Sequence, residues 1–388
     1  MHATAQRQAG LAVCGFTAGV VLCLSLLAQG QVTAPGFRSG VDLVVVDAVV
    51  IDRDGRPVRN LTADDFEIRE DGRVQRVAQL QIISIGPGGP NAIEPPAVDS
   101  APMASTSALR YQGRRIAVVI DDLHLIEADI ELIKRVLDEV ARTVAPSDEV
   151  AAVFVGRSDL SRHFARGPSA AREASGRVRD ALGFGLDAGS MKPFTLSYAI
   201  SVTSTLQSVI DATADSSSSR RFILYVSGGS ILSMNADPKS PERRAAESLE
   251  GALARVYERA RRANVAIYTL DPRGLVLPET AVRGDINSEQ VRRQVAERVV
   301  NQHQYLSEIA LNTGGRSFFN LPDPRKGVAA ILEENSHYYL ISYQPDPPRF
   351  DGRFHQISVR VKAPGVTVRA RRGYVAPSKS SGRKDPRR

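Results

Sequence analysis

The sequence predicts an α/β fold, with a doubly wound, mostly parallel sheet and a β-sandwich-like region formed by N- and C-terminal strands. Three observations lead to this prediction. Residues 116–120 and 222–226 are short apolar runs, typical of strands that are buried on both faces. Between residues 114 and 319, strand-like runs alternate with segments of helical periodicity, as in a parallel α/β layer. Residues 41–85 and 338–371 show the alternation and the Asp-Gly turns of antiparallel strands.

The N-terminal segment of residues 11–28 is apolar and uncharged, and small residues follow it. We interpret residues 1–34 as a cleaved signal peptide; the alternative is an uncleaved anchor, since about 18 apolar residues approach the length of a membrane span. We therefore expect an extracytoplasmic protein, periplasmic or secreted, with a membrane contact only if the segment is uncleaved. Both cysteines, Cys14 and Cys23, lie in this segment, so the exported part would contain no disulfide and no cysteine metal site.

An N-terminal β module is expected over residues 37–86. Its first strand covers residues 41–51, and a hairpin follows that turns at Asp71-Gly72. Residues 87–112 are rich in Gly, Pro, Ala and Ser and show no periodicity, so we expect a linker there.

The α/β region is expected over residues 113–323. Its strands are predicted at residues 114–120, 150–155, 222–226, 265–270 and 315–319, with a short edge strand at 160–165. Its helices are predicted at residues 126–144, 170–182, 198–214, 241–263 and 290–311.

A second β region is expected over residues 324–376, where a short helix precedes strands at 338–343, 355–362 and 366–371. We predict that these strands pair with the N-terminal β module in one sandwich, because neither half alone has enough strands to bury its faces. The basic tail, residues 377–388, is predicted to be disordered.

The composition excludes several classes of function. The chain has 388 residues, of which 43% are hydrophobic and 24% charged, as in a globular protein of two or three domains. The formal net charge is +7, but part of it lies in the basic tail. No basic patch is interleaved with aromatic residues, so we predict no nucleic-acid partner.

The first strand of the α/β region ends in two acids, Asp121 and Asp122. In parallel α/β sheets, ligands bind beyond the carboxyl ends of the strands. The two acids therefore occupy the predicted position of a binding site.

Residues 114–322 resemble a von Willebrand factor A domain. The resemblance depends on the hydrophobic strand ending in Asp121, the long helix after it, the strand ending in Ser227-Gly-Gly-Ser230, and the run AIYTL at residues 266–270. The flanking runs VDLVVV, DGRPV, EDG and YYLISY resemble the exported "VWFA-related" proteins common in Acidobacteria. The resemblance implies a protein-binding or adhesion module that uses a metal-ion-dependent adhesion site.

That site is degenerate in this sequence. The family pattern is Asp-x-Ser-x-Ser after the first strand, a later Thr, and an Asp after the central strand. Asp121 matches the first acid, but Leu123 and Leu125 occupy the two serine positions. Leucine cannot coordinate a hard cation, so oxygen ligands are too few for ordinary Mg²⁺ or Ca²⁺ binding, and we expect no cofactor.

The remaining family positions leave three candidate metal ligands. Thr195, or alternatively Ser197, matches the threonine, and Ser227 stands where the second acid is expected. Asp121, Thr195 and Ser227 thus form the residual metal set.

Two further residues, Asp122 and His124, are additional to the family motif. With Asp121 they could form a rearranged site for Zn²⁺. The alternative is that the acids accept hydrogen bonds from nearby backbone N–H groups and that one of the acids holds His124.

No catalytic residue is assigned. A phosphatase of the haloacid-dehalogenase type would need a second acid at Leu123, and no Gly-x-Ser-x-Gly motif is present. Surface or core positions are expected for His163, His303, His337 and His355.

We therefore predict a non-enzymatic exported module that binds another protein beyond the strand ends. The crevice residues are Asp121, Asp122, His124, Thr195, Ser197, Ser227, Ser230 and Asp271. The alternatives are an exported hydrolase of unrecognised type that uses Asp121 and Asp122, and an inert crevice beside a β region that does the binding.

Overall fold

The structure is a computed structural model. It describes residues 43–86, 89–93, 113–182, 195–214, 220–230, 232, 239–275, 289–370 and 373–376. The predicted signal peptide, the basic tail and residues 183–194, which precede the predicted crevice residue Thr195, lie outside the described residues.

A six-stranded sheet forms the centre of the α/β region. Its order is β11-β10-β9-β6-β7-β8, and the strands are parallel except for β8, which runs antiparallel to β7. The strands are β6 (Arg114–Ile120), β7 (Glu149–Phe154), β8 (Arg162–Arg166), β9 (Arg220–Val226), β10 (Ala266–Leu270) and β11 (Ser317–Phe318).

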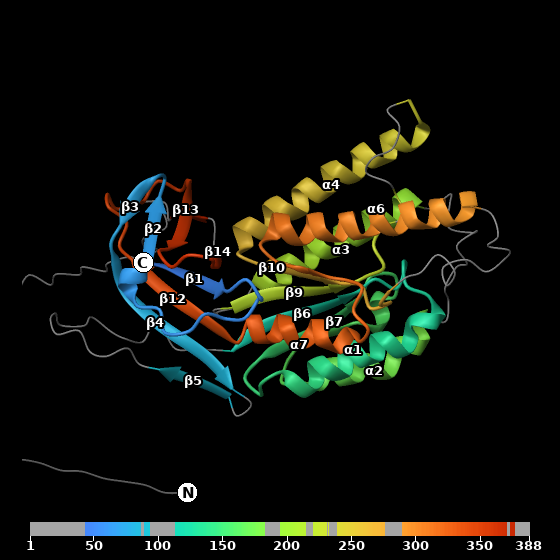
Figure 1. Cartoon of the computed structure of the whole chain (residues 1–388), viewed down its shortest axis with the longest axis horizontal. Helices are drawn as coiled ribbons and strands as arrows, with labels where there is room; N and C mark the ends of the chain where they lie inside the picture. The colour runs from blue at the N-terminus through green and yellow to red at the C-terminus, as the bar shows by residue number, and fades with distance from the viewer. Residues whose placement is uncertain are drawn as a thin grey trace, which may run out of the picture. The chain divides into compact units, whose positions relative to one another are not determined.

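Within the described part of the chain, three helices pack on each face of this sheet (Figure 1). One face carries α1 (Ile130–Thr143), α2 (Ser169–Leu182) and α7 (Pro324–Glu334), and the other carries α3 (Thr195–Ala214), α4 (Pro241–Ala263) and α6 (Glu289–Thr313). The residues of β6 alternate between the two cores. Val118 packs in the first core and Val119 in the second, which is why residues 116–120 of this strand are all apolar.

Two antiparallel sheets form the β region. A five-stranded sheet has the order β14-β1-β12-β4-β5, and a four-stranded sheet has the order β15-β13-β2-β3. The strands are β1 (Val44–Ile51), β2 (Phe66–Glu70), β3 (Arg73–Gln75), β4 (Val77–Gly86), β5 (Gly89–Ile93), β12 (His337–Tyr343), β13 (Phe354–Val361), β14 (Thr367–Ala370) and β15 (Gly373–Val375).

Strands from the two ends of the chain pair within both of these sheets. In the larger sheet, β12 pairs with β1 on one side and with β4 on the other. In the smaller sheet, β13 pairs with β2, so that Val359 lies opposite Ile68. A shared core of Val46, Ile68, Ile341 and Ile357 connects residues of both sheets.

The predicted fold class is confirmed in its general form, as a mostly parallel six-stranded sheet together with antiparallel sheets. The linker predicted over residues 87–112 differs from the structure at residues 89–93, where β5 pairs with β4, and its other residues lie outside the described part of the chain. Pro90 can lie in β5 because β5 is an edge strand. Proline has no backbone N–H to donate, and the outer side of an edge strand has no neighbouring strand that needs one. Among the described residues, we find no helix long and apolar enough to span a membrane.

Polar contacts join the β region to the amino-terminal end of the parallel sheet. Arg220, the first residue of β9, forms an ion pair of 2.8 Å with Asp47 of β1. Asn264 Nδ2 donates a hydrogen bond of 2.6 Å to the same carboxylate. Arg220 begins β9 and Asp121 follows the last residue of β6, so these contacts lie at the end of the sheet opposite Asp121.

Candidate functional site

We define the carboxyl-edge site as the polar residues that follow β6, β9 and β10: Asp121, Asp122, His124, Ser227, Ser230 and Asp271. Asp121 is its centre and is fully buried. Its backbone N–H donates to Val226 O at 2.9 Å, which places the side chain between the ends of β6 and β9.

The carboxylate of Asp121 accepts hydrogen bonds from its own chain. The hydroxyls of Tyr225 and Ser227 donate to Oδ2 over 2.6 and 2.7 Å. His124 Nδ1 lies 2.9 Å from Oδ2 and 3.0 Å from Oδ1. Donors supplied by neighbouring strands and loops therefore occupy the position in which a cation would meet this acid.

Asp121 and His124 form a buried ion pair. Burial opposes the charge of Asp121, but the His124 ring and the two hydroxyls outweigh burial and lower the pKa of the carboxyl. Burial likewise opposes the charge of His124, and Asp121 reverses the effect and raises the pKa of the imidazole. Among the described residues, His124 Nε2 has no hydrogen-bond partner.

Asp122 holds the neighbouring loop in place. It accepts the backbone N–H groups of Gly156 and Arg157 over 2.7 and 2.9 Å. A Cβ at position 156 would lie 2.7 Å from a methyl carbon of Leu123, so a residue larger than glycine would displace the Leu123 side chain. Burial, which these N–H groups only partly offset, raises the pKa of Asp122 to about 6.

Asp271 ties the ends of β9 and β10 together through Arg273. The guanidinium Nε and Nη2 donate to the Asp271 carboxylate over 2.9 and 2.8 Å, and Nη2 also donates to Gly228 O at 2.8 Å. His303 Nε2 lies 3.4 Å from the same carboxylate. Burial is outweighed by Arg273 and His303, which lower the pKa of Asp271.

The structure brings together only part of the predicted set. Ser227 bonds to Asp121, whereas Ser230 Oγ accepts the backbone N–H of Leu232 at 3.1 Å. Ser197 is exposed on the first turn of α3 and makes no described contact with Asp121. Thr195 begins α3, and its side chain lies outside the described part of the chain.

The two leucines at the serine positions have a packing role. Leu125 is buried in one core and Leu123 packs against the other, so each points into a helix layer. The hydrogen-bond interpretation of the acids describes Asp122 correctly. For Asp121 it is wrong in detail, because the donors around its carboxylate are side chains and not backbone N–H groups.

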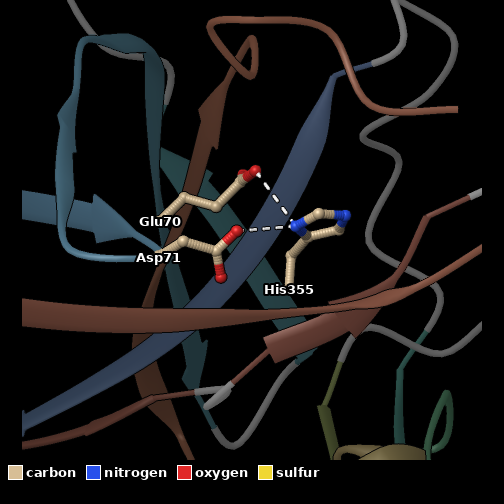
Figure 2. Close-up of side chains that lie close together, drawn as sticks. All are labelled: Glu70, Asp71 and His355. Carbon is tan, nitrogen blue, oxygen red and sulfur yellow. Dashed lines mark hydrogen bonds and ion pairs between the residues drawn. The ribbon is translucent and has the colours of Figure 1, made fainter. Parts of the chain in front are cut away.

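Sequence reasoning missed Tyr225, because it lies within the β9 run that reads as apolar core. It also missed a second polar group in the β region, which we call the hairpin cluster: Glu70, Asp71 and His355 (Figure 2). His355 Nδ1 lies 2.7 Å from Asp71 Oδ2 and 3.9 Å from Glu70 Oε1. In the sequence, the only sign of this cluster was Asp71, the acid of the predicted Asp71-Gly72 turn.

The sequence matches no family model and no curated protein. Two of the similar solved structures are an aerotolerance-related membrane protein from Bacteroides fragilis and a mutant of the PilB minor pilin from Streptococcus sanguinis. The first is 13% identical with a TM-score of 0.29, over 57% of this chain and 98% of that one. The second is 9% identical with a TM-score of 0.35, over 75% of this chain and 88% of that one.

Proposed function

We propose that this chain is an exported von Willebrand factor A-type module that binds another protein with the loops at its carboxyl-edge site and catalyses no reaction. The sequence resemblance favours the exported type common in Acidobacteria, in the periplasm or outside the cell. Neither a nucleic acid nor a Mg²⁺ or Ca²⁺ ion is part of the proposal. A membrane contact enters it only if the N-terminal segment is uncleaved.

The observation that carries the proposal is the closed hydrogen-bond set around Asp121. A nucleophile or general base needs an oxygen that can reach a substrate, whereas this fully buried carboxylate is held by Tyr225, Ser227 and His124. A metal site needs several free oxygen ligands on one cation. The acids of this edge are instead arranged to hold the loops rigidly, which favours recognition by a preformed surface.

The same edge also carries apolar anchors. Ile126 follows β6 and is 51% exposed, and Leu275 follows β10 and is 64% exposed. Large aliphatic side chains beside fixed charged groups are suited to the centre of a protein interface, where anchors are surrounded by polar contacts.

One observation favours the hydrolase alternative. A carboxyl whose pKa is raised to about 6, such as Asp122, is typical of a general acid or base. Both oxygens of Asp122 are however engaged by backbone N–H groups, which favours a structural role.

Site-specific photo-crosslinking tests the proposal. A photoreactive residue replaces Ile126 or Leu275, and the purified protein is irradiated in an extract of the source cells containing EDTA. A matched control replaces Leu311, which is 69% exposed at the opposite end of the sheet. We expect the same protein adduct from both edge positions and not from Leu311. Adducts from Leu311 alone, or hydrolysis of ester, phosphate or peptide substrates that Asp121→Asn abolishes, would contradict the proposal.

A further inference from the structure

We propose that the hairpin cluster of Glu70, Asp71 and His355 is a binding site for a divalent transition-metal ion of the Zn²⁺ type, separate from the carboxyl-edge site. Each residue offers one ligand atom, and the three atoms lie within 4.8 Å of one another. Figure 2 shows both carboxylates turned toward the same ring nitrogen of His355.

The separations of these atoms suit a small cation. Three ligands at metal–ligand distances of about 2.1 Å in a tetrahedral arrangement lie roughly 3.4 Å apart. The observed distances from His355 Nδ1 are 2.7 Å to Asp71 and 3.9 Å to Glu70, on either side of that value. Side-chain movements that change these two distances by about 0.5–0.7 Å would bring both to the tetrahedral value.

The fold holds the two carboxylates in register with the imidazole. Glu70 ends β2 opposite Ile357 of β13, and Asp71 begins the turn to β3 with a φ of 49°. The Asp71 backbone N–H donates to Gln356 O at 2.9 Å, and the Gln356 N–H returns a 3.0 Å bond to Asp71 Oδ1. The hydroxyl of Tyr343 donates to Glu70 Oε2 over 2.7 Å, and Oε1, which lies on the His355 side, accepts from Arg349 Nε over 3.2 Å.

The surroundings of His355 distinguish this cluster from an ordinary group of acids. Its second nitrogen, Nε2, lies 3.1 Å from Asp351 Oδ1, so the buried ring has a carboxylate at each nitrogen. Carboxylates only accept hydrogen bonds, and a neutral imidazole carries a single N–H. When both ring nitrogens are protonated, each N–H faces a carboxylate. A metal ion at Nδ1 would replace the proton there and leave the N–H on Nε2 directed at Asp351. A carboxylate on the far nitrogen is the usual partner of a metal-bound histidine.

The donor set selects the class of metal. One imidazole nitrogen with two carboxylate oxygens suits Zn²⁺ and its neighbours, whereas Mg²⁺ and Ca²⁺ prefer oxygen ligands alone. The side chain of Asp71 is 39% exposed, which gives an ion a path from solvent.

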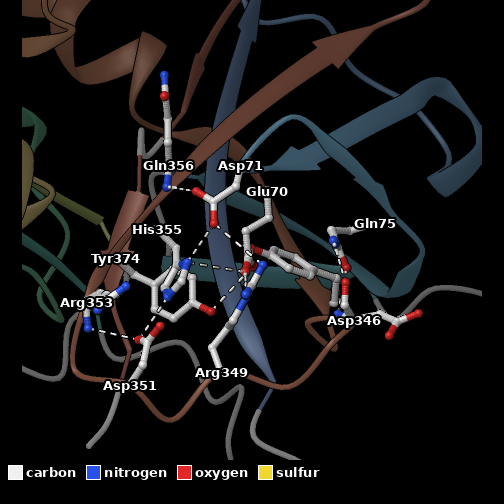
Figure 3. Close-up of polar contacts among 11 residues, drawn as sticks. Glu70, Asp71, Gln75, Asp346, Arg349, Asp351, Arg353, His355, Gln356 and Tyr374 are labelled. Carbon is white, nitrogen blue, oxygen red and sulfur yellow. Dashed lines mark hydrogen bonds and ion pairs between the residues drawn. The ribbon is translucent and has the colours of Figure 1, made fainter.

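Arg349 is the competing cation (Figure 3). Its Nε lies 3.2 Å from Glu70 Oε1 and its Nη2 3.6 Å from Asp71 Oδ2. Arg349 and a protonated His355 balance two of the three carboxylate charges of Glu70, Asp71 and Asp351. A dication that replaces the proton on Nδ1 would, together with Arg349, balance all three. To admit the ion, Arg349 must turn away from the two ligand oxygens. Its removal should therefore strengthen metal binding, which a purely structural ion-pair network would not show.

Calorimetric titration of the full chain with Zn²⁺ in chelator-free buffer tests the proposal. We expect one Zn²⁺ per chain, with affinity lowered at least about tenfold by His355→Gln or by Asp71→Asn, since each removes one ligand. Arg349→Gln should raise the affinity. His163→Gln, which changes an exposed histidine on β8, is the matched control and should leave it unchanged.

Two results would overturn the proposal. One is the absence of saturable Zn²⁺ binding in both the wild type and Arg349→Gln. The other is binding that survives His355→Gln and Asp71→Asn, which would assign the ion to other residues, such as His124. Circular dichroism of each variant shows that it is folded. If His355→Gln fails to fold, Asp71→Asn at its partly exposed position and Arg349→Gln keep the test decisive.

Discussion

Replacing Asp121 should destabilise the protein strongly, whether or not Mg²⁺ is present. Asp121→Ala leaves the buried His124 ring without its counter-charge and removes the acceptor for the hydroxyls of Tyr225 and Ser227. Breaking a buried ion pair by removing one partner costs about 3–5 kcal/mol. That is a large share of a total unfolding free energy of about 5–15 kcal/mol.

A second variant separates one hydrogen bond from the ion pair. Tyr225→Phe removes the hydroxyl that donates to Asp121 over 2.6 Å and leaves the His124 contact intact. A hydrogen bond to a charged group contributes about 1.5–3 kcal/mol, so we expect a smaller loss than in Asp121→Ala.

Urea unfolding followed by far-ultraviolet circular dichroism measures both losses, since the chain contains no tryptophan for fluorescence. Each curve is recorded in EDTA and in Mg²⁺, and we expect the two to coincide. A metal site at Asp121 predicts a different result in each buffer. Its acids would repel one another without a cation, so Asp121→Ala would stabilise the protein in EDTA, and Mg²⁺ would stabilise only the wild type. That pattern would refute the closed hydrogen-bond set.

Three further predictions concern other parts of the fold. Burial holds the pKa of His337 near 4, below its usual 6.5, so this residue contributes stability that is lost as the pH falls from 6.5 to 4. The loss should be about 2–3 kcal/mol in urea titrations, and a His337→Gln profile that fell equally over this range would contradict it. Asp47→Asn leaves Arg220 buried without its partner, and we expect a loss of about 3–5 kcal/mol by urea unfolding; a loss below 1 kcal/mol would show that the pair is unimportant. Gly156→Ala should lower the free energy of unfolding by about 1–3 kcal/mol, because the added methyl meets Leu123. The loss should appear as a lower thermal unfolding midpoint, and an unchanged midpoint would show that the loop adjusts freely.

The strands of the parallel sheet could be predicted because burial on both faces leaves a direct mark on the sequence. Val118 and Val119 face opposite cores, so no polar residue occurs between Ile116 and Ile120 of β6. The position of the carboxyl-edge site followed from that ending. β5 could not be predicted, because an edge strand needs neither an apolar run nor the absence of proline.

The contacts within both sites depend on tertiary register, which the sequence does not display. Tyr225 reads as a core aromatic, and only the pairing of β6 with β9 directs its hydroxyl to Asp121. His355 and Asp71 are 284 positions apart and meet because β13 pairs with β2. Periodicity indicates which face a residue occupies, but it does not indicate the residue opposite.

The affinity for the crosslinked partner, measured in EDTA and again in Mg²⁺, distinguishes a closed hydrogen-bond set at Asp121 from a metal site. We expect the same Kd in both buffers for the wild type, because His124, Tyr225 and Ser227 already satisfy Asp121. Leu275→Glu should weaken binding at least about tenfold as an interface anchor, and Leu311→Glu should leave it unchanged. Binding that disappears in EDTA and returns with Mg²⁺ would contradict the account and restore a metal-dependent site at Asp121.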